Sequence, residues 1–133
     1  MTTTISGSNG IVFPDATSMQ TGQQAVKAWV NFNGTGTVAI RAGYNVASIS
    51  DNGTGDYTVN FTTAMTDVNY SVLGSTTVPG YNSATGSLMI MSRLNSGTPD
   101  VFANTVNAVR VRTAQQGISN SFDSQYVCVS IFR

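Results

Sequence analysis

Apolar and polar residues alternate with a period of two along most of this chain. Because successive side chains of a β-strand point to opposite faces, this alternation predicts strands. The alternating runs lie at residues 26–32, 37–41, 44–50, 57–61, 68–74, 108–113 and 126–132, and a short apolar run lies at residues 88–91. Segments rich in Gly, Asn and Pro separate them. Such a series of short strands predicts an all-β fold, an antiparallel two-sheet sandwich that is jelly-roll-like, and disfavours an immunoglobulin-like sandwich, whose paired cysteines are missing.

The run at residues 26–32 divides its side chains between two faces. Its apolar face is predicted to consist of Val26, Ala28, Val30 and Phe32. Trp29 falls on the other face, together with Lys27 and Asn31. We expect Trp29 to cover an open end of the sandwich, and contact with a sheet edge, a neighbouring chain or a ligand is the alternative.

Later runs predict further inward-facing residues. An Asn-Gly turn within residues 51–56 lies between two alternating runs, which is a strong hairpin signal. We expect the core to receive Tyr57, Val59, Phe61, Val68, Tyr70, Val72, Val109 and Val111, and Ala47 and Ile49 to face one way. Arg110 and Arg112 then face outward, towards solvent or an acidic partner.

Residues 1–24 differ from the remainder, and we divide the chain into this N-terminal arm and a β-sandwich domain at residues 25–133. The arm carries isolated apolar residues among Thr, Ser, Gly and Gln, too few to form a core. Three copies that pool these residues around a common axis would solve this problem; an arm that folds over its own domain is the alternative. The candidate attachment or oligomer contacts are Ile5, Ile11, Phe13 and Met19.

Charge and hydropathy exclude several classes of partner. The chain has six basic and six acidic residues, and charged residues make up only 9% of it. Nucleic acids and anionic membranes require clustered Lys and Arg, so we expect neither as a partner. No apolar run approaches the roughly 20 residues of a membrane span, which argues against membrane insertion. Because the N-terminus lacks a signal-peptide pattern, synthesis in the cytoplasm is expected.

Catalytic chemistry has little support in the composition. The chain contains no His and one cysteine, Cys128, so Ser-His-Asp and Cys-His arrangements are impossible. Asp51 and Asp56 flank a turn, where Asp is common for conformational reasons, and they would make a weak calcium site. We therefore expect no enzymatic activity, no metal and no cofactor.

Two segments of the N-terminal half resemble a known kind of module. They are KAWVNFNGTG at residues 27–36, with Arg41 and YNVASISDNGTGDYTVNF at residues 44–61, and, upstream, GIVFPD at residues 10–15 with Thr17 and Gln20. This combination resembles modules of tail-fibre and other appendage proteins of tailed bacteriophages, including cyanophages. Residues 16–19 depart from the pattern, and residues 76–125 have no counterpart in it.

The resemblance implies a phage virion structural protein, a trimeric tail fibre or fibre-tip module that mediates host-surface adsorption. Its partners would be its own copies in a homotrimer, other virion proteins reached through the arm, and a host cell-surface glycan. A capsid decoration protein or head fibre is the alternative; an enzyme such as a polysaccharide depolymerase is disfavoured by the lack of acidic clusters. Receptor specificity would lie in the distal loops, whose candidate residues are Tyr81, Asn82, Thr98, Pro99 and Asp100.

Overall fold

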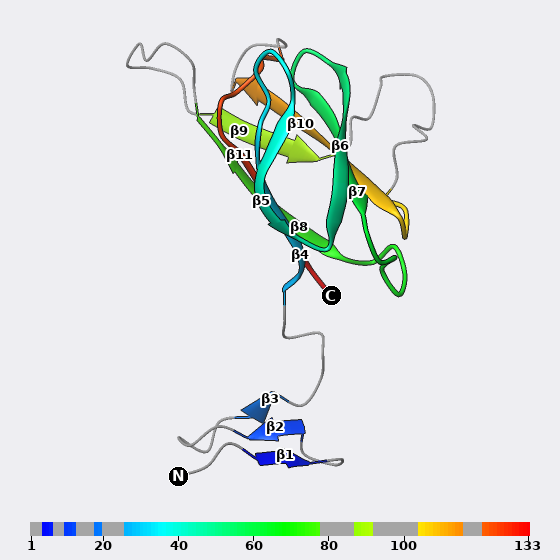
Figure 1. Ribbon diagram of the computed structural model, residues 1–133. Helices are drawn as coiled ribbons and strands as arrows, with labels where there is room; N and C mark the ends of the chain where they lie inside the picture. Colours follow the sequence, from blue (N-terminus) through cyan, green and yellow to red (C-terminus); the bar gives the residue numbers. More distant parts are fainter. Residues whose placement is uncertain are drawn as a thin grey trace.

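The chain folds into an all-β, antiparallel two-sheet sandwich, with a separate small sheet near its N-terminus (Figure 1). This computed structural model describes residues 4–6, 10–12, 18–19, 26–77, 87–91, 104–115 and 121–133. Within those residues every regular element is a strand. The predicted fold class is therefore confirmed.

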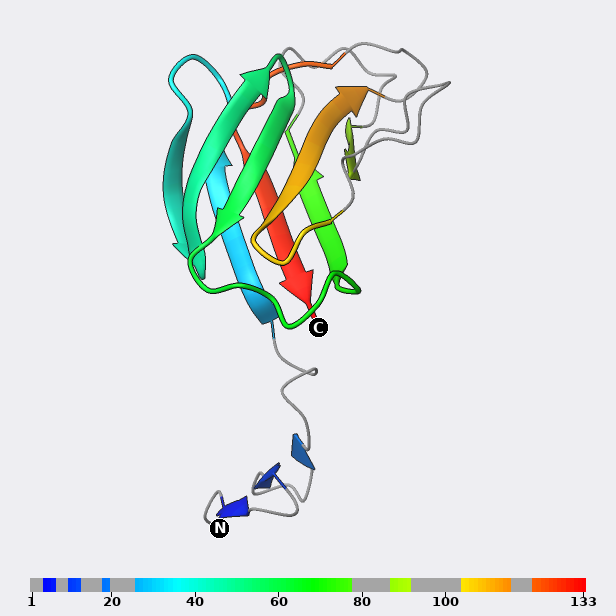
Figure 2. The ribbon, with the colours of Figure 1, turned by 90° about the vertical axis from the view of Figure 1, so that its right-hand side faces the viewer.

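The sandwich consists of two four-stranded sheets that pack face to face (Figure 2). Sheet I has the order β5-β4-β11-β8. Its strands are β4 (Val26–Asn33), β5 (Ala39–Tyr44), β8 (Ser71–Thr76) and β11 (Val127–Phe132). Sheet II has the order β6-β7-β10-β9. Its strands are β6 (Val46–Gly53), β7 (Asp56–Phe61), β9 (Ser87–Met91) and β10 (Ala108–Gln115).

The first and last strands of the sandwich, β4 and β11, lie side by side in the centre of sheet I. Their register places Val30 opposite Val129 and Ala28 opposite Ile131. These four residues are buried, which follows from the alternation within both strands. The central pair thus supplies much of the apolar surface that sheet I turns towards sheet II.

The core lies between the two sheets and confirms most of the predicted inward faces. Its buried members are Ala28, Val30, Phe32, Tyr57, Val59, Phe61, Met65, Tyr70, Val109, Val111, Val127, Val129 and Ile131. Phe32 of sheet I meets Tyr57 of sheet II edge to face, with 5.1 Å between ring centroids. Such aromatic pairs add specific geometry to the burial of apolar area.

The predicted inward positions Val68 and Val26 are wrong, and Ala47 and Ile49 do not face the same way, each for a local reason. Val68 is exposed because β8 begins only at Ser71, so residue 68 belongs to the preceding loop. Ala47 is exposed while Val46 and Ile49 pack against the core, because the register shifts between Val46 and Ser48. Val26 is also exposed, at the start of β4, where the pairing with β11 is irregular.

One end of the sandwich is held by Asp123, which connects both sheets. Its Oδ1 accepts a hydrogen bond from the Gly55 amide at 2.8 Å and lies 2.9 Å from the Tyr57 hydroxyl. That hydroxyl is also 2.8 Å from the carbonyl oxygen of Gly34, in the β4–β5 turn. Burial, together with the neighbouring carboxylate, raises the pKa of Tyr57 well above its ordinary value.

Gly55 permits the close approach on which this end depends. Its φ is +64°, and a Cβ at this position would lie 2.6 Å from the carbonyl oxygens of Phe122 and Thr113. Gly36, in the β4–β5 turn, has a similar φ of +61° but open space around it. Only glycine fits at Gly55, because both the conformation and the contact exclude a side chain.

Candidate binding surface

The outer face of sheet I carries a row of side chains that crosses all four strands, and those on β4, β5 and β8 are exposed. Trp29 of β4 lies opposite Tyr44 of β5 and Ser130 of β11, and Ser130 lies opposite Leu73 of β8. Tyr44 is 59% exposed, Trp29 40% and Leu73 67%. Large apolar side chains at such exposure, gathered on one face, are typical of an interaction site.

The placement of Trp29 corrects one prediction from the sequence. Trp29 does not cover an open end of the sandwich, because it lies on the outer face of sheet I, between Tyr44 of β5 and Ser130 of β11. Its neighbour Tyr44 was not a predicted site residue. Simple hairpin counting from the Asn33–Ala39 pair would place Gly43 opposite Trp29. The register shift between Asn31 and Phe32 places Tyr44 there instead, and alternation does not reveal that shift.

A cavity of about 460 Å³ opens next to this row, where β4 begins and β11 ends. This volume lies within the range of small-molecule binding sites. Tyr44 belongs to both the row and the cavity. The described residues that line it are Lys27, Tyr44, Asn45, Thr62, Thr63, Ala64, Met65, Thr66 and Arg133.

Asn45 fixes the shape of the cavity at the corner where the chain passes from sheet I to sheet II. Its φ is +56°, a left-handed conformation that Asn tolerates better than most residues. Its side-chain amide donates to the carbonyl oxygens of Lys27 at 3.0 Å and Thr63 at 3.1 Å. Its Oδ1 accepts from the Thr63 amide at 2.7 Å. Asn45 therefore ties the loop at residues 62–66 to the start of β4.

Among the described residues that line the cavity, one positive charge has no counter-ion. Arg133 forms an ion pair with Asp67, and hydrogen bonding to Arg133 holds the pKa of Asp67 below its ordinary value. The Lys27 ammonium, in contrast, has no hydrogen-bond or ion-pair partner among the residues that the structure describes. None of the described lining residues is acidic.

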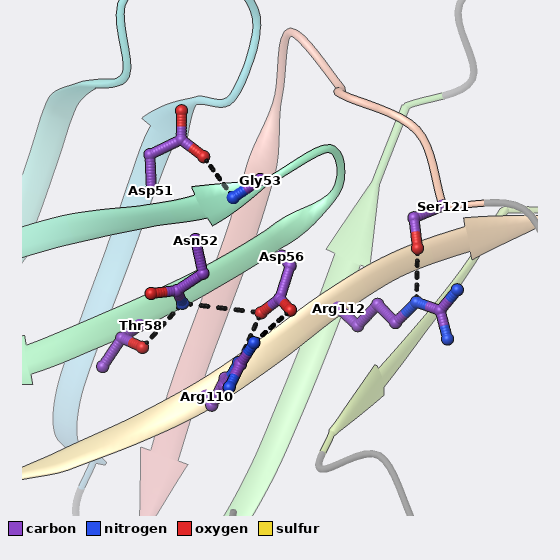
Figure 3. Close-up of polar contacts among 8 residues, drawn as sticks. All are labelled: Asp51, Asn52, Gly53, Asp56, Thr58, Arg110, Arg112 and Ser121. Carbon is purple, nitrogen blue, oxygen red and sulfur yellow. Dashed lines mark hydrogen bonds and ion pairs between the residues drawn. The ribbon is translucent and has the colours of Figure 1, made fainter. Parts of the chain in front are cut away.

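The outer face of sheet II is polar, and its side chains bind one another (Figure 3). Arg110 donates from Nε to Oδ1 of Asp56 at 2.6 Å and from Nη2 to Oδ2. Asn52 donates to the Thr58 hydroxyl at 2.9 Å. Arg112 donates from Nε to the hydroxyl of Ser121.

The Arg110–Asp56 pair answers the question that the sequence left open for Arg110. Its acidic partner belongs to the same chain. The hydrogen bonds from Arg110 hold the pKa of Asp56 below its ordinary value. Asp51 accepts from the Gly53 amide at 2.9 Å, the local turn contact expected of an Asp at this position. The described groups of this face thus satisfy one another.

Three of the predicted oligomer contacts occupy one row of the small sheet. This sheet consists of β1 (Thr4–Ser6), β2 (Gly10–Val12) and β3 (Ser18–Met19). Its register places Ile5 opposite Ile11, and Ile11 opposite Met19. The fourth candidate, Phe13, lies outside the described residues.

The predicted receptor-facing residues Tyr81, Asn82, Thr98, Pro99 and Asp100 also lie outside the described residues. The structure instead draws attention to residues that were not among the predicted site residues, above all Lys27, Tyr44, Asn45 and the loop at residues 62–66. They come from distant parts of the chain, so no local motif connects them.

A search of the described ranges for three or more grouped His, Cys, Asp or Glu residues finds no candidate metal site. In the same part of the chain, no helix is long and apolar enough to cross a membrane. Comparisons of the chain with protein-family models, with curated proteins and with solved structures gave no match.

Proposed function

We propose that this chain is a structural protein of a tailed-phage virion, a trimeric tail-fibre or fibre-tip module that contributes to adsorption to the host surface. The observation that carries the binding part is the exposed row of Tyr44, Trp29 and Leu73 beside an open cavity. The resemblance of residues 10–15 and 27–61 to phage appendage modules supplies the biological setting.

The small sheet supports the trimeric part of the proposal. Its strands are two or three residues long, and so small a sheet requires packing against something else to be stable. The row of Ile5, Ile11 and Met19 offers apolar residues for that packing. Three such rows around one axis would supply a shared core. Several copies of a weak binding site on one particle would then give high avidity.

Competition with virus particles tests adsorption directly. We expect the purified full-length protein to slow adsorption of the phage that encodes it, because both compete for the same surface groups. The matched control is the same protein after thermal denaturation. Unchanged adsorption at saturating protein would contradict the receptor-binding part.

Gold labelling of the protein on intact virions tests its location. Label on the tail supports the proposal, whereas label on the head would favour a capsid decoration protein or head fibre.

Light scattering tests the trimer. We expect a trimer mass for the full chain and a monomer mass for Ile11→Asp, because a carboxylate in the apolar row opposes its burial. Ser6→Asp, outside that row, is the matched control and should remain trimeric. A monomer mass for the unaltered chain would overturn this part.

A further inference from the structure

We infer, on the basis of the adsorption function proposed above, that the cavity beside Tyr44 binds a sugar residue that carries a carboxylate, with Trp29 and Tyr44 as the stacking platform and Lys27 as the charge partner. The cavity and the aromatic pair form one continuous surface, since Tyr44 belongs to both. Lys27 precedes Trp29 by two residues on β4 and therefore shares its outward face.

The aromatic pair supplies a platform for the flat face of a sugar ring. A pyranose presents C–H groups on its faces and hydroxyls around its edge. Trp29 and Tyr44 are directly opposite on neighbouring strands, so their rings are close enough to contact one ligand. Both side chains combine an apolar ring with a polar group at its edge, which matches the apolar C–H face and the polar hydroxyl edge of a sugar.

The loop at residues 62–66 supplies hydrogen-bonding groups for the edge of the ring. Thr62, Thr63 and Thr66 line the cavity and are exposed. Each threonine hydroxyl both donates and accepts, as each sugar hydroxyl does. The side chain of Asn45 is already engaged by Lys27 and Thr63, so Asn45 acts as a positioning residue for this loop.

The charge of the cavity selects an acidic sugar. Asp67 balances Arg133, and Lys27 remains as the single uncompensated charge among the described lining residues. A single carboxylate matches it, and a partly enclosed ion pair is stronger than one in open water. A neutral sugar would leave the ammonium unpaired. Discrimination therefore comes from Lys27, whereas general sugar affinity comes from the aromatic pair.

The chain offers a direct reporter, because Trp29 is its only tryptophan. The full-length protein is titrated with oligogalacturonate and with sialyllactose, and intrinsic fluorescence is recorded. The neutral comparisons are oligogalactan and lactose. We expect a saturable change with at least one acidic probe, and binding of its neutral counterpart that is about fivefold weaker, the effect of one partly exposed ion pair. No saturable change with either acidic probe overturns the inference.

Two variants separate the two roles. Tyr44→Ala should weaken binding of the acidic probe about tenfold, as loss of a central aromatic contact does. Lys27→Met should lower acidic affinity to the level of the neutral probe and leave neutral affinity unchanged. The matched controls are Tyr126→Ala and Arg41→Gln; the Arg41 guanidinium lies over the Tyr126 ring, and neither residue lines the cavity. A control that weakens binding as much as its counterpart contradicts the assignment.

Two further results distinguish this inference from its alternatives. If Tyr44→Ala converts a trimer into a monomer, the face of sheet I is an interface between copies of the chain, and the inference is overturned. If acidic sugars fail to bind but the protein still competes with virus for adsorption, the inference fails and the proposed function remains. Sugar binding without competition would support the sugar site and contradict the adsorption function.

Discussion

The two outer faces of the sandwich share one core but differ in chemistry. On sheet II, polar side chains bind one another, as Arg110 binds Asp56 and Arg112 binds Ser121. On sheet I, Trp29, Tyr44 and Leu73 expose apolar surface, and Lys27 has no partner among the described residues. Polar groups that already bond to one another gain little free energy from a ligand. Exposed apolar groups and an unpaired charge gain more, because a ligand can cover or pair them. Binding is therefore expected on sheet I and structural support on sheet II.

The largest effect on stability is expected at Gly55, where the turn of sheet II contacts Asp123. Gly55→Ala should lower the free energy of unfolding by about 3 kcal/mol, since it adds left-handed strain to a clash with two carbonyl oxygens. The control Gly36→Ala, at a similar φ in the turn of sheet I, meets open space and should cost about 1 kcal/mol. Urea denaturation measures both, and equal losses would show that the two turns are anchored alike.

The next effect concerns the polar network itself. Arg110→Gln should lower the free energy of unfolding at neutral pH by about 1.5 kcal/mol, because it leaves the half-buried Asp56 carboxylate without its two-point partner. Arg41→Gln removes an exposed arginine on sheet I that lies over the ring of Tyr126, and should cost about 0.5 kcal/mol. If urea denaturation shows a larger loss of unfolding free energy for Arg41→Gln than for Arg110→Gln, the polar contacts of sheet II are not the more stabilising ones.

The same pair predicts a pH dependence. The folded state lowers the pKa of Asp56 from its ordinary 3.8, so the stabilisation is fully present above pH 3.8 and is lost as the pH falls through the folded-state value. The difference in stability between the unaltered chain and Arg110→Gln should therefore shrink in acid. Urea midpoints at neutral pH and well below pH 3.8 measure it, and a constant difference would contradict the role of the Asp56 charge.

The smallest expected effect belongs to sheet I. Leu73 is 67% exposed, so Leu73→Thr should change the free energy of unfolding by less than about 0.5 kcal/mol. Val109→Thr, which places a hydroxyl in the core, is the contrasting control and should cost more than about 1 kcal/mol. A large, concentration-dependent loss for Leu73→Thr in thermal unfolding would mean that another subunit covers the outer face of sheet I.

The sequence predicts the strands well because alternation is a local property. It places Phe32, Tyr57 and Val109 in the core, and all three are buried. The sequence does not predict the bulge after Val46. A bulge depends on how two strands pair, whereas alternation describes each strand by itself. The contact of Asp123 with Gly55 and Tyr57 joins residues far apart in the chain, and Asp123 lies outside every alternating run, so the pattern does not predict the contact.

The candidate site was harder to predict than the fold. Alternation shows that Trp29 faces away from the core, but it does not show which residues lie beside Trp29. The cavity draws on Lys27, Tyr44, the loop at residues 62–66 and Arg133, which only the complete topology brings together. The predicted arm residues Ile5, Ile11 and Met19 do share one row, since each lies on a short strand whose partner follows in sequence.

The pairing of β4 with β11 also has a consequence for synthesis on the ribosome. β11 lies between β4 and β8, so β4 is paired only with β5, and β8 has no neighbour in sheet I, until residues 127–132 have left the exit tunnel. A nascent chain that stops earlier would present two open strand edges, which favours aggregation. Pairing between strands so far apart in the chain is also slow, because the entropy cost of closing the long loop comes before the stabilising contacts form. β11 thus completes the sheet that carries the candidate binding surface.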